Sequence, residues 1–291
     1  MAELRDWLEG ARIRTLPAAV APILVGTGAA YEAGSGSVPR ALLAAAVALS
    51  FQVGVNFAND YSDGIRGTDD VRTGPPRLTG GGLAAPATVK TAAIASLGIG
   101  CLFGLALVFV SGTWELIIAG GLAVCAAWLY TGGSKPYGYR GLGEVYVFVF
   151  FGLMATLGTT WTQAGQLPAS AWLGAVGVGL IACALLMVNN IRDIPTDSQV
   201  GKQTLAVRMG DRAARLAFVG MLAVPVLLAS AMAIRSPWTL LVLLLVPAIA
   251  VQARRVLSGA AGRDLIVVLR DTGLIELGYG IAILAGLTLS V

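Results

Sequence analysis

Long apolar stretches separated by shorter polar connections run along the whole chain. Each stretch holds about 20 residues, which is the length that a helix needs to cross the hydrocarbon core of a bilayer. The pattern therefore predicts an all-α, polytopic membrane protein with nine transmembrane helices. These helices are expected at roughly residues 15–31, 39–59, 88–110, 113–130, 144–163, 170–189, 213–234, 238–253 and 271–290.

The composition agrees with a membrane protein. Hydrophobic residues make up 56% of the chain and charged residues 12%, and the mean hydropathy is +0.78. A soluble domain keeps about a quarter of its residues charged, so the composition excludes an ordinary water-soluble fold. Because no linker or low-complexity segment interrupts the pattern, we interpret residues 1–291 as a single integral-membrane domain.

The basic residues test the number of crossings and set their orientation. If the N-terminus is cytoplasmic and nine helices alternate, all but two of the 20 Lys and Arg residues fall on the cytoplasmic side. The two exceptions are Arg40 and Arg235, so the distribution follows the positive-inside rule. We predict a multi-pass protein of the cell membrane with its N-terminus and long polar loops in the cytoplasm. The positive net charge reflects this topology and gives no indication of nucleic-acid binding.

Two polar motifs each follow an apolar stretch directly. Asn59 and Asp63 end the second predicted helix, and Asn189 and Asp193 end the sixth, 130 residues later. Residues four apart share one face of a helix, so each motif projects an amide oxygen and a carboxylate in the same direction. The repetition indicates an internal duplication of a four-helix unit, to which a ninth helix is added.

Further oxygen-bearing residues extend both motifs. Asp197 continues the second motif along its helix face, while Gln52 and Asn56 continue the first back into the apolar helix. Acidic side chains at the ends of apolar helices are costly unless a cation lies between them, and Mg²⁺ prefers oxygen ligands and binds together with substrate phosphates. We therefore predict two Mg²⁺ ions. The predicted ligands are Asn59, Asp60, Asp63, Asp69, Asn189, Asp193 and Asp197.

Cations and glycines on the same predicted side of the membrane suit an anionic ligand. The loop from Tyr130 to Glu144 is rich in Gly and contains Lys135 and Arg140, and flexible backbone with nearby cations accommodates phosphate. The chain has no histidine, so catalysis falls to carboxylates, amides, cations and Tyr. We assign catalytic roles to Asp63, Asp193 and Lys135. We assign substrate binding to Arg14, Gln52, Asn56, Arg77, Tyr130, Arg140, Arg192 and Lys202.

These residues together fit a lipid diphosphate that is bridged by Mg²⁺ at the membrane face, with its tail in an intramembrane cavity between the helices. Metal-bound diphosphate is a good leaving group because the charge that develops on its oxygens is neutralised in place. An allylic tail would leave a carbocation, which aromatic faces can shelter. The candidate aromatic residues are Tyr130, Tyr146, Phe148, Phe150, Phe151 and Trp161.

At these motifs the chain resembles the UbiA superfamily of intramembrane prenyltransferases, whose members carry Asp-rich loops after the second and sixth of nine helices. The matching residues are Asn59, Asp63, Asn189, Asp193 and Asp197. The six-residue spacing from Asp63 to Asp69, the segment 12–22 and the loop 130–144 resemble the menaquinone-forming branch. The resemblance implies that a polyprenyl group is transferred from polyprenyl diphosphate to the aromatic acceptor 1,4-dihydroxy-2-naphthoate. Diphosphate and CO₂ would be released, and demethylmenaquinone would form.

Other interpretations stay open on the sequence. Prenyl transfer to 4-hydroxybenzoate or homogentisate would use the same metal chemistry. The segment Asp60–Gly64 matches the start of a CDP-alcohol phosphotransferase motif, but the Asp residues that should follow are missing. A cation-coupled secondary transporter would place its polar residues near the bilayer midplane. The carboxylates here lie at helix ends instead, and only Glu276 departs from that rule.

Overall fold

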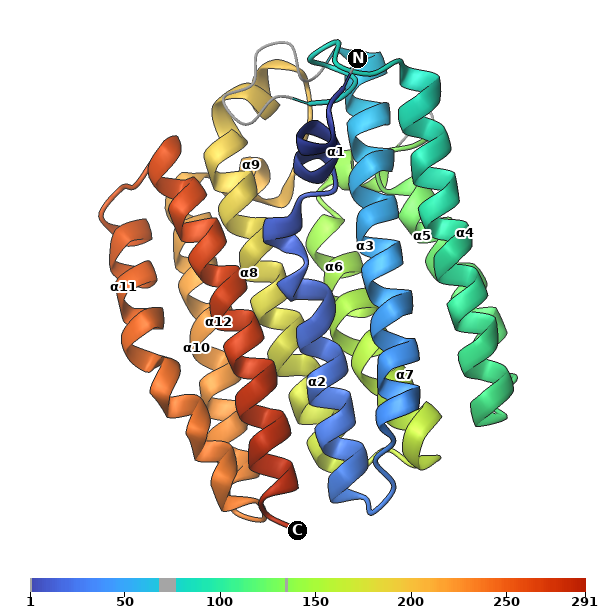
Figure 1. Cartoon of the computed structure of the whole chain (residues 1–291). Coiled ribbons are helices and arrows are strands. Elements are labelled where there is room, and N and C mark those ends of the chain that lie inside the picture. Colours follow the sequence, from blue (N-terminus) through green and yellow to red (C-terminus); the bar gives the residue numbers. More distant parts are fainter. Residues whose placement is uncertain (1, 68–76, 134–135) are drawn as a thin grey trace.

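The apolar stretches form helices because a chain in lipid must pair its backbone polar groups within its own segment. The computed structural model describes residues 2–67, 77–133 and 136–291, and the regular structure within them is helical throughout. The helices lie side by side as an elongated bundle (Figure 1). The elements are α1 (Leu4–Gly10), η1 (Ile13–Thr15), α2 (Pro17–Glu32), α3 (Val38–Arg66), α4 (Pro86–Ser111), α5 (Leu116–Leu129), η2 (Tyr137–Arg140), α6 (Gly143–Val147), η3 (Phe148–Met154), α7 (Ala155–Ala164), α8 (Ala169–Gln199), α9 (Leu205–Met209), α10 (Asp211–Met232), η4 (Pro237–Leu245), α11 (Val246–Leu257) and α12 (Arg263–Thr288).

Six helical segments of the described chain are long and apolar enough to cross a membrane. They are Val38–Arg66, Pro86–Ser111, Gly143–Ala164, Ala169–Gln199, Asp211–Met232 and Pro237–Leu257. The other three predicted crossings correspond to α2, α5 and α12. Helices α2 and α5 have only 16 and 14 residues, and α12 carries Asp271 and Glu276 in its apolar part. The all-α, multi-pass prediction is confirmed, while the number nine stays a prediction.

The outside of the bundle is apolar along its length. Outward-pointing side chains include Leu102, Phe109, Ile118 and Leu244, which are 67%, 74%, 73% and 75% exposed. Monomeric soluble proteins rarely expose large contiguous apolar surfaces, whereas lipid covers such a surface favourably. The exterior therefore agrees with a protein that is embedded in a bilayer.

Helices α8, α10 and α12 form the densely packed part of the bundle. Ile181, Phe218 and Tyr279, one from each of these helices, are at most 1% exposed in their common core. Helix α8 also approaches η3 closely, because Gly152 and Gly179 meet there: a Cβ on either one would lie 2.6 or 2.8 Å from the Cα of the other. Small residues permit such close approach between membrane helices, and here they hold α8 firmly against η3.

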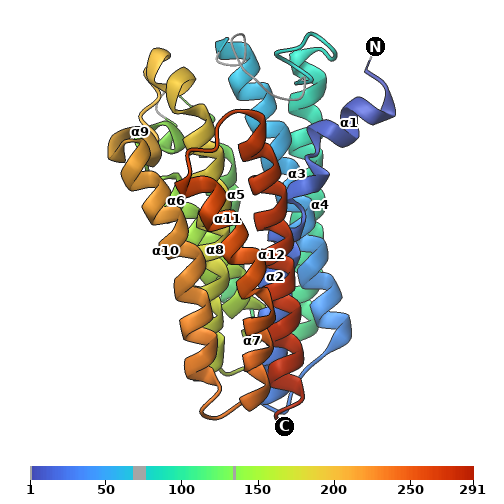
Figure 2. The same cartoon turned by 90° about the vertical axis from the view of Figure 1, so that its left-hand side faces the viewer.

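The described parts of the long polar connections gather at one end of the bundle, called the polar end below. The N-terminus, α9 and the end of α3 lie there, and the C-terminus lies at the opposite end (Figures 1 and 2). Helix α1 is anchored beside α3 by Trp7, whose ring packs edge-on against Phe57 with a centroid distance of 5.6 Å. This arrangement brings the N-terminal segment and the polar loops around the same space.

Candidate active site

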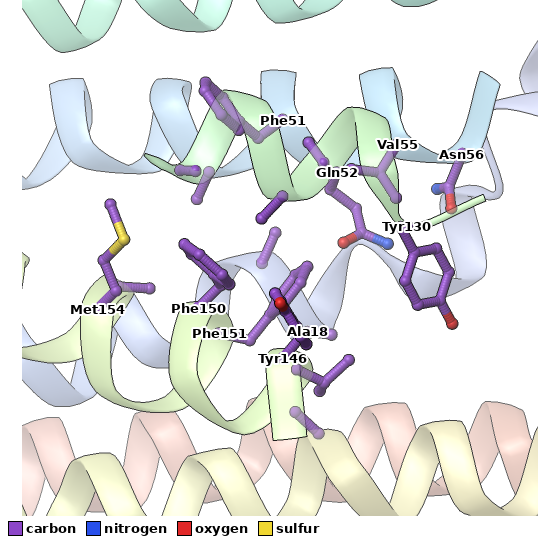
Figure 3. A pocket seen from close by; sticks show the side chains of 18 of the residues that line it. Ala18, Phe51, Gln52, Val55, Asn56, Tyr130, Tyr146, Phe150, Phe151 and Met154 are labelled. Carbon is purple, nitrogen blue, oxygen red and sulfur yellow. The ribbon is translucent and has the colours of Figure 1, made fainter. Parts of the chain in front are cut away.

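A cavity of about 1350 Å³ lies among α2, α3, α4, α5 and the continuous helix from α6 to α7. Its lining extends from Asp63 at the polar end to Trp161 on α7. Figure 3 shows Gln52 and Tyr130 toward one side of the cavity, and Phe150 beyond them in its apolar part. A polar mouth that continues into an apolar interior suits an amphiphilic ligand with a charged head and a long tail.

Aromatic rings follow one wall of the cavity. Tyr137 stacks on Tyr146 with a centroid distance of 3.7 Å, and Tyr146 stacks on Phe150 at 6.1 Å. Of the six aromatic candidates for sheltering a carbocation, Tyr130, Tyr146, Phe150, Phe151 and Trp161 line the cavity. Phe148 does not line it and packs close to Gly179 instead. Segment η3 has π-helical turns, which are frequent at functional sites.

The first motif lies at the end of α3 and faces the cavity. The Thr131 hydroxyl donates to Asn59 Oδ1 at 2.9 Å, and the Tyr139 hydroxyl donates to Asp63 Oδ1 at 2.6 Å. Both donors belong to the segment that follows α5, more than 70 residues away in sequence. The orientation of the first motif therefore depends on a distant segment.

Asp60 differs from its two neighbours in the first motif. Its side chain is completely buried, and its two carboxylate oxygens accept the backbone N–H groups of Leu78 and Thr79 at 3.0 and 2.8 Å. It does not line the cavity. The contacts favour a structural role, in which Asp60 holds the segment before α4 against α3, over the predicted role as a metal ligand.

The second motif follows one face of α8, as its spacing predicts, and Asn189, Asp193 and Asp197 all line the cavity. Arg192 donates to both carboxylate oxygens of Asp193, at 2.7 and 2.6 Å, and to Asn189 Oδ1 at 2.9 Å. Lys202 Nζ lies 3.4 Å from Asp197 Oδ1. The partners of this motif are therefore cations that are close to it in sequence.

The two motifs influence each other across the mouth of the cavity. Asp197 lies in the last turns of α8, and its side chain is buried. Asp63 of α3 and Asp193 of α8 line the same cavity as Asp197. Because carboxylates of two helices face one space, the mouth concentrates negative charge that a divalent cation would relieve.

Tyr139 joins the first motif to the segment after α8. Its hydroxyl contacts Asp63, and its ring has Lys202 Nζ at 5.2 Å and Arg66 Cζ at 5.7 Å from the centroid. Its carbonyl oxygen accepts the backbone N–H of Gln203 at 3.0 Å. The three polar segments that the sequence analysis considered separately thus meet in the structure at a single tyrosine.

Most of the predicted site residues line the cavity. These are Gln52, Asn56, Asn59, Asp63, Arg77, Tyr130, Asn189, Arg192, Asp193, Asp197 and Lys202. Arg140 is exposed in η2 and does not line it. Asp69 and Lys135 lie outside the described residues, and so does the side chain of Arg14, whose backbone belongs to η1.

Gln52 and Asn56 hold the turn that connects α1 to α2. Gln52 Nε2 donates to Thr15 Oγ1 at 3.1 Å, and Asn56 Nδ2 donates to the carbonyl oxygen of Ala11 at 2.9 Å. The Thr15 hydroxyl donates to the carbonyl oxygen of Arg12 at 2.9 Å. Arg12 has a φ of 54°, which is uncommon for a residue other than glycine, and it lines the cavity. The two amides thus fix the backbone that presents Arg12.

Five site residues were not assigned from the sequence. Arg12, Thr131, Tyr139 and Asn190 line the cavity, and Glu144 lies behind Asn190, which donates to it through Nδ2 at 2.9 Å. A sequence signal existed for Asn190, since two asparagines are adjacent in the motif, and for Glu144, a lone acid at the start of a predicted helix. Thr131 and Tyr139 lie in the Gly-rich loop that the sequence analysis singled out, but the sequence did not indicate their individual roles, because their partners Asn59 and Asp63 are distant in sequence.

The available donors suit a divalent cation that shares its ligands with a substrate. Among the residues that the structure describes, no three Asp, Glu, His or Cys side chains converge into a closed metal site. Amide and carboxylate oxygens of α3 and α8 nevertheless face one cavity. Mg²⁺ is usually bound by one or two carboxylates together with water and substrate phosphates, so an open set of oxygen donors at the mouth fits Mg²⁺ with a diphosphate.

Comparisons with known proteins agree with this geometry. The model of the UbiA prenyltransferase family matches residues 19–266. The chain is 50% identical to the "1,4-dihydroxy-2-naphthoate octaprenyltransferase" of Mycobacterium tuberculosis, over 99% of this chain and 98% of that protein. The apo structure of a UbiA homolog from Aeropyrum pernix K1 has a TM-score of 0.69 at 17% identity, covering 93% and 97% of the two chains. A UbiA homolog from Archaeoglobus fulgidus bound to DMAPP and Mg²⁺ has a TM-score of 0.68 at 14% identity, covering 96% and 99%. The two solved structures show the likeness of fold.

Proposed function

The chain belongs to the UbiA prenyltransferase family, and we propose that it transfers a polyprenyl group from polyprenyl diphosphate to 1,4-dihydroxy-2-naphthoate. The products are diphosphate, CO₂ and demethylmenaquinol, the hydroquinone whose later oxidation gives demethylmenaquinone. The observation that carries this proposal is the 50% identity, across nearly the full length of both chains, to a relative with that activity in its name. The cavity supports it, because a polar mouth and an apolar interior match a diphosphate head and an isoprenoid tail.

We place the diphosphate at the mouth, between the two motifs. The residues that would hold Mg²⁺ are Asn59, Asp63, Asn189, Asp193 and Asp197. Because the two motifs lie on two different helices, we expect two Mg²⁺ ions. When bound, Mg²⁺ supplies positive charge that stabilises the departing diphosphate. Arg192 and Lys202 face the same space and provide further cations for the diphosphate oxygens.

The isoprenoid tail occupies the apolar part of the cavity, which the aromatic wall borders. As the diphosphate leaves, positive charge develops on the allylic end of the tail. The faces of Tyr146 and Phe150 lie along the cavity, and such faces attract a cation electrostatically. Most side chains that line this part of the cavity are apolar, and an apolar lining disfavours the water that would hydrolyse a carbocation.

The aromatic acceptor attacks this cation directly. Dihydroxynaphthoate is electron-rich, so the reaction needs no strong base, in keeping with a chain that has no histidine. The acceptor carboxylate requires a cation nearby, and Arg12, in the turn fixed by Gln52 and Asn56, is placed to supply it. In this arrangement, Gln52 and Asn56 line the cavity and also hold the backbone that carries Arg12.

The chain is a multi-pass membrane protein, and we further propose that it crosses the membrane nine times with its polar end in the cytoplasm. The distribution of the 20 Lys and Arg residues supports this orientation. The similar positions of the two motifs, at the ends of the long helices α3 and α8, support an internal duplication of a four-helix unit within one domain. Cysteine-accessibility labelling that placed residue 67 or 200 outside the cell would overturn the orientation.

The function is tested with purified protein in lipid vesicles. Prenyl diphosphates of several chain lengths are combined with dihydroxynaphthoate, 4-hydroxybenzoate or homogentisate, with Mg²⁺ or with EDTA. We expect prenylation of dihydroxynaphthoate in Mg²⁺ and none in EDTA. Prenylation of 4-hydroxybenzoate alone would refute the acceptor while leaving the family assignment intact.

A further inference from the structure

Glu144 is a buried carboxyl group one layer behind the cavity wall. It is 5% exposed and lies at the start of α6. Its Oε1 accepts the hydrogen bond from Asn190, and its Oε2 is buried without a hydrogen-bond partner among the residues that the structure describes. A buried carboxyl oxygen without a partner is costly, and the metal chemistry proposed above does not use this residue.

Asn190 connects Glu144 to the cavity. It is 7% exposed and lines the cavity from α8. Because its Nδ2 is bonded to Glu144, the orientation of its amide is set, and its Oδ1 is the atom that can accept a hydrogen bond. Consecutive residues of a helix point about 100° apart, so Asn190 is directed away from Asn189 and its partner Arg192.

The chemistry of this pair selects the kind of group that it binds. An amide oxygen that is backed by a carboxyl group attracts a hydrogen-bond donor and repels an anion such as diphosphate. Among the reactants of the proposed function, the neutral donors are the two ring hydroxyls of the acceptor. Asn190 therefore suits a hydroxyl, whereas the cationic side chains at the mouth suit the anionic groups.

We propose, resting on the function proposed above, that Asn190 Oδ1 binds a ring hydroxyl of the acceptor and that Glu144 is a positioning residue that fixes the Asn190 amide. As the ring carbon that bears the carboxylate attacks the allylic carbon, a ring electron pair forms the new bond. The bond to diphosphate breaks with its electron pair on the diphosphate. The bond to the carboxylate then breaks, CO₂ leaves, and that electron pair returns to the ring.

The hydroxyl keeps its proton throughout this sequence. While the ring carries positive charge, between attack and loss of CO₂, the hydroxyl becomes a stronger donor. Its hydrogen bond to Asn190 therefore strengthens in the transition state, which lowers the barrier. Among the described residues, neither Asn190 nor Glu144 forms a hydrogen bond to a proposed metal ligand. The pair would therefore act on the acceptor and leave the metal site unchanged.

The experiment measures discrimination between acceptors in the wild type, Glu144→Leu and Asn190→Ala; leucine removes the oxygen that accepts the hydrogen bond from Asn190, which glutamine would keep. Dihydroxynaphthoate is compared with 1-hydroxy-2-naphthoate and 4-hydroxy-2-naphthoate, as substrates and as competitive inhibitors. We expect each variant to lose about 10–100-fold in kcat/KM for dihydroxynaphthoate, with the KM for prenyl diphosphate and the Mg²⁺ requirement unchanged. The wild type should favour dihydroxynaphthoate over one monohydroxy analogue, and both variants should lose that preference.

Cys183→Ala is the matched control. Cys183 is buried on α8 and donates to the carbonyl oxygen of Glu144 at 3.2 Å, so this variant disturbs the same helix contact without touching the amide. It should keep the wild-type preference between acceptors. If Glu144→Leu and Asn190→Ala also keep that preference, or if they change the Mg²⁺ requirement instead, the inference is wrong. If the wild type does not prenylate dihydroxynaphthoate, the proposed function itself fails.

Discussion

The two motifs have nearly the same sequence pattern but are held in place in different ways. Asn59 and Asp63 are oriented by hydroxyl groups that lie 72 and 76 positions away in the chain. Asn189 and Asp193 are oriented by Arg192, which lies between them on the same helix. The first motif is therefore assembled by tertiary structure and the second largely by its own helix, so the two should respond differently to mutation.

The largest effect is expected from removing a carboxylate of either motif. Asp63→Ala and Asp193→Ala should each lower kcat by about 10²–10³-fold or more, since the site loses charge stabilisation of the departing diphosphate. Prenyl transfer by the vesicle-reconstituted variants, with Mg²⁺ titrated to high concentration, provides the measurement. Wild-type turnover in both variants, or full wild-type turnover in excess EDTA, would refute a metal site shared by the two motifs.

Arg192→Gln tests the locally held motif and should lower activity by about 100-fold, near the upper end for residues that orient metal ligands. Without Mg²⁺ the variant leaves the partly buried carboxylate of Asp193 without its Arg192 partner, so the variant should unfold at a lower temperature than the wild type. Added Mg²⁺ should then raise its unfolding temperature more than that of the wild type. Arg212→Gln, at an exposed position in the first turn of α10, is the control and should change neither property.

Tyr139→Phe tests the motif that is held from a distance. Loss of the hydroxyl that orients Asp63 should raise the Mg²⁺ concentration needed for half-maximal activity by about tenfold. Tyr137→Phe is the matched control: it removes a hydroxyl from the same η2 segment, but that hydroxyl donates to the carbonyl oxygen of Ala126. An equal shift in both variants would mean that η2 is merely loosened and that Tyr139 has no specific role at the first motif.

The smallest effect on the reaction is expected at Asp60. Asp60→Asn replaces one of two acceptors of buried backbone N–H groups and should lower the free energy of unfolding by about 1–3 kcal/mol. The Mg²⁺ dependence should stay unchanged, in contrast to Asp63→Asn, which should need more Mg²⁺. Thermal unfolding and Mg²⁺ titration of the two variants separate these roles. If Asp60→Asn needs a higher Mg²⁺ concentration for activity, Asp60 is a metal ligand after all and the structural role is wrong.

Two neighbouring carboxylates in the first motif have different roles that the sequence pattern could not distinguish. Asp60 and Asp63 are both carboxylates at the end of an apolar helix, and the sequence analysis treated both as ligands. The structure directs Asp63 to the cavity and Asp60 to the backbone of Leu78 and Thr79. Their spacing along the chain does not distinguish a structural carboxylate from a metal ligand, because the role of each depends on which distant segment packs against that side of α3.

The sequence by itself determined the properties that depend on local chemistry. Apolar stretches form helices wherever backbone groups must be paired within lipid, and a spacing of four aligns Asn189, Asp193 and Asp197 on one face of α8. Only the tertiary structure decided which polar side chains pair with one another. Tyr139 orients Asp63, and Asn190 donates a hydrogen bond to Glu144. Gln52 and Asn56 support the turn that contains Arg12. Helical periodicity repeats along any such segment, whereas the partner of a polar side chain depends on which remote segment packs against it.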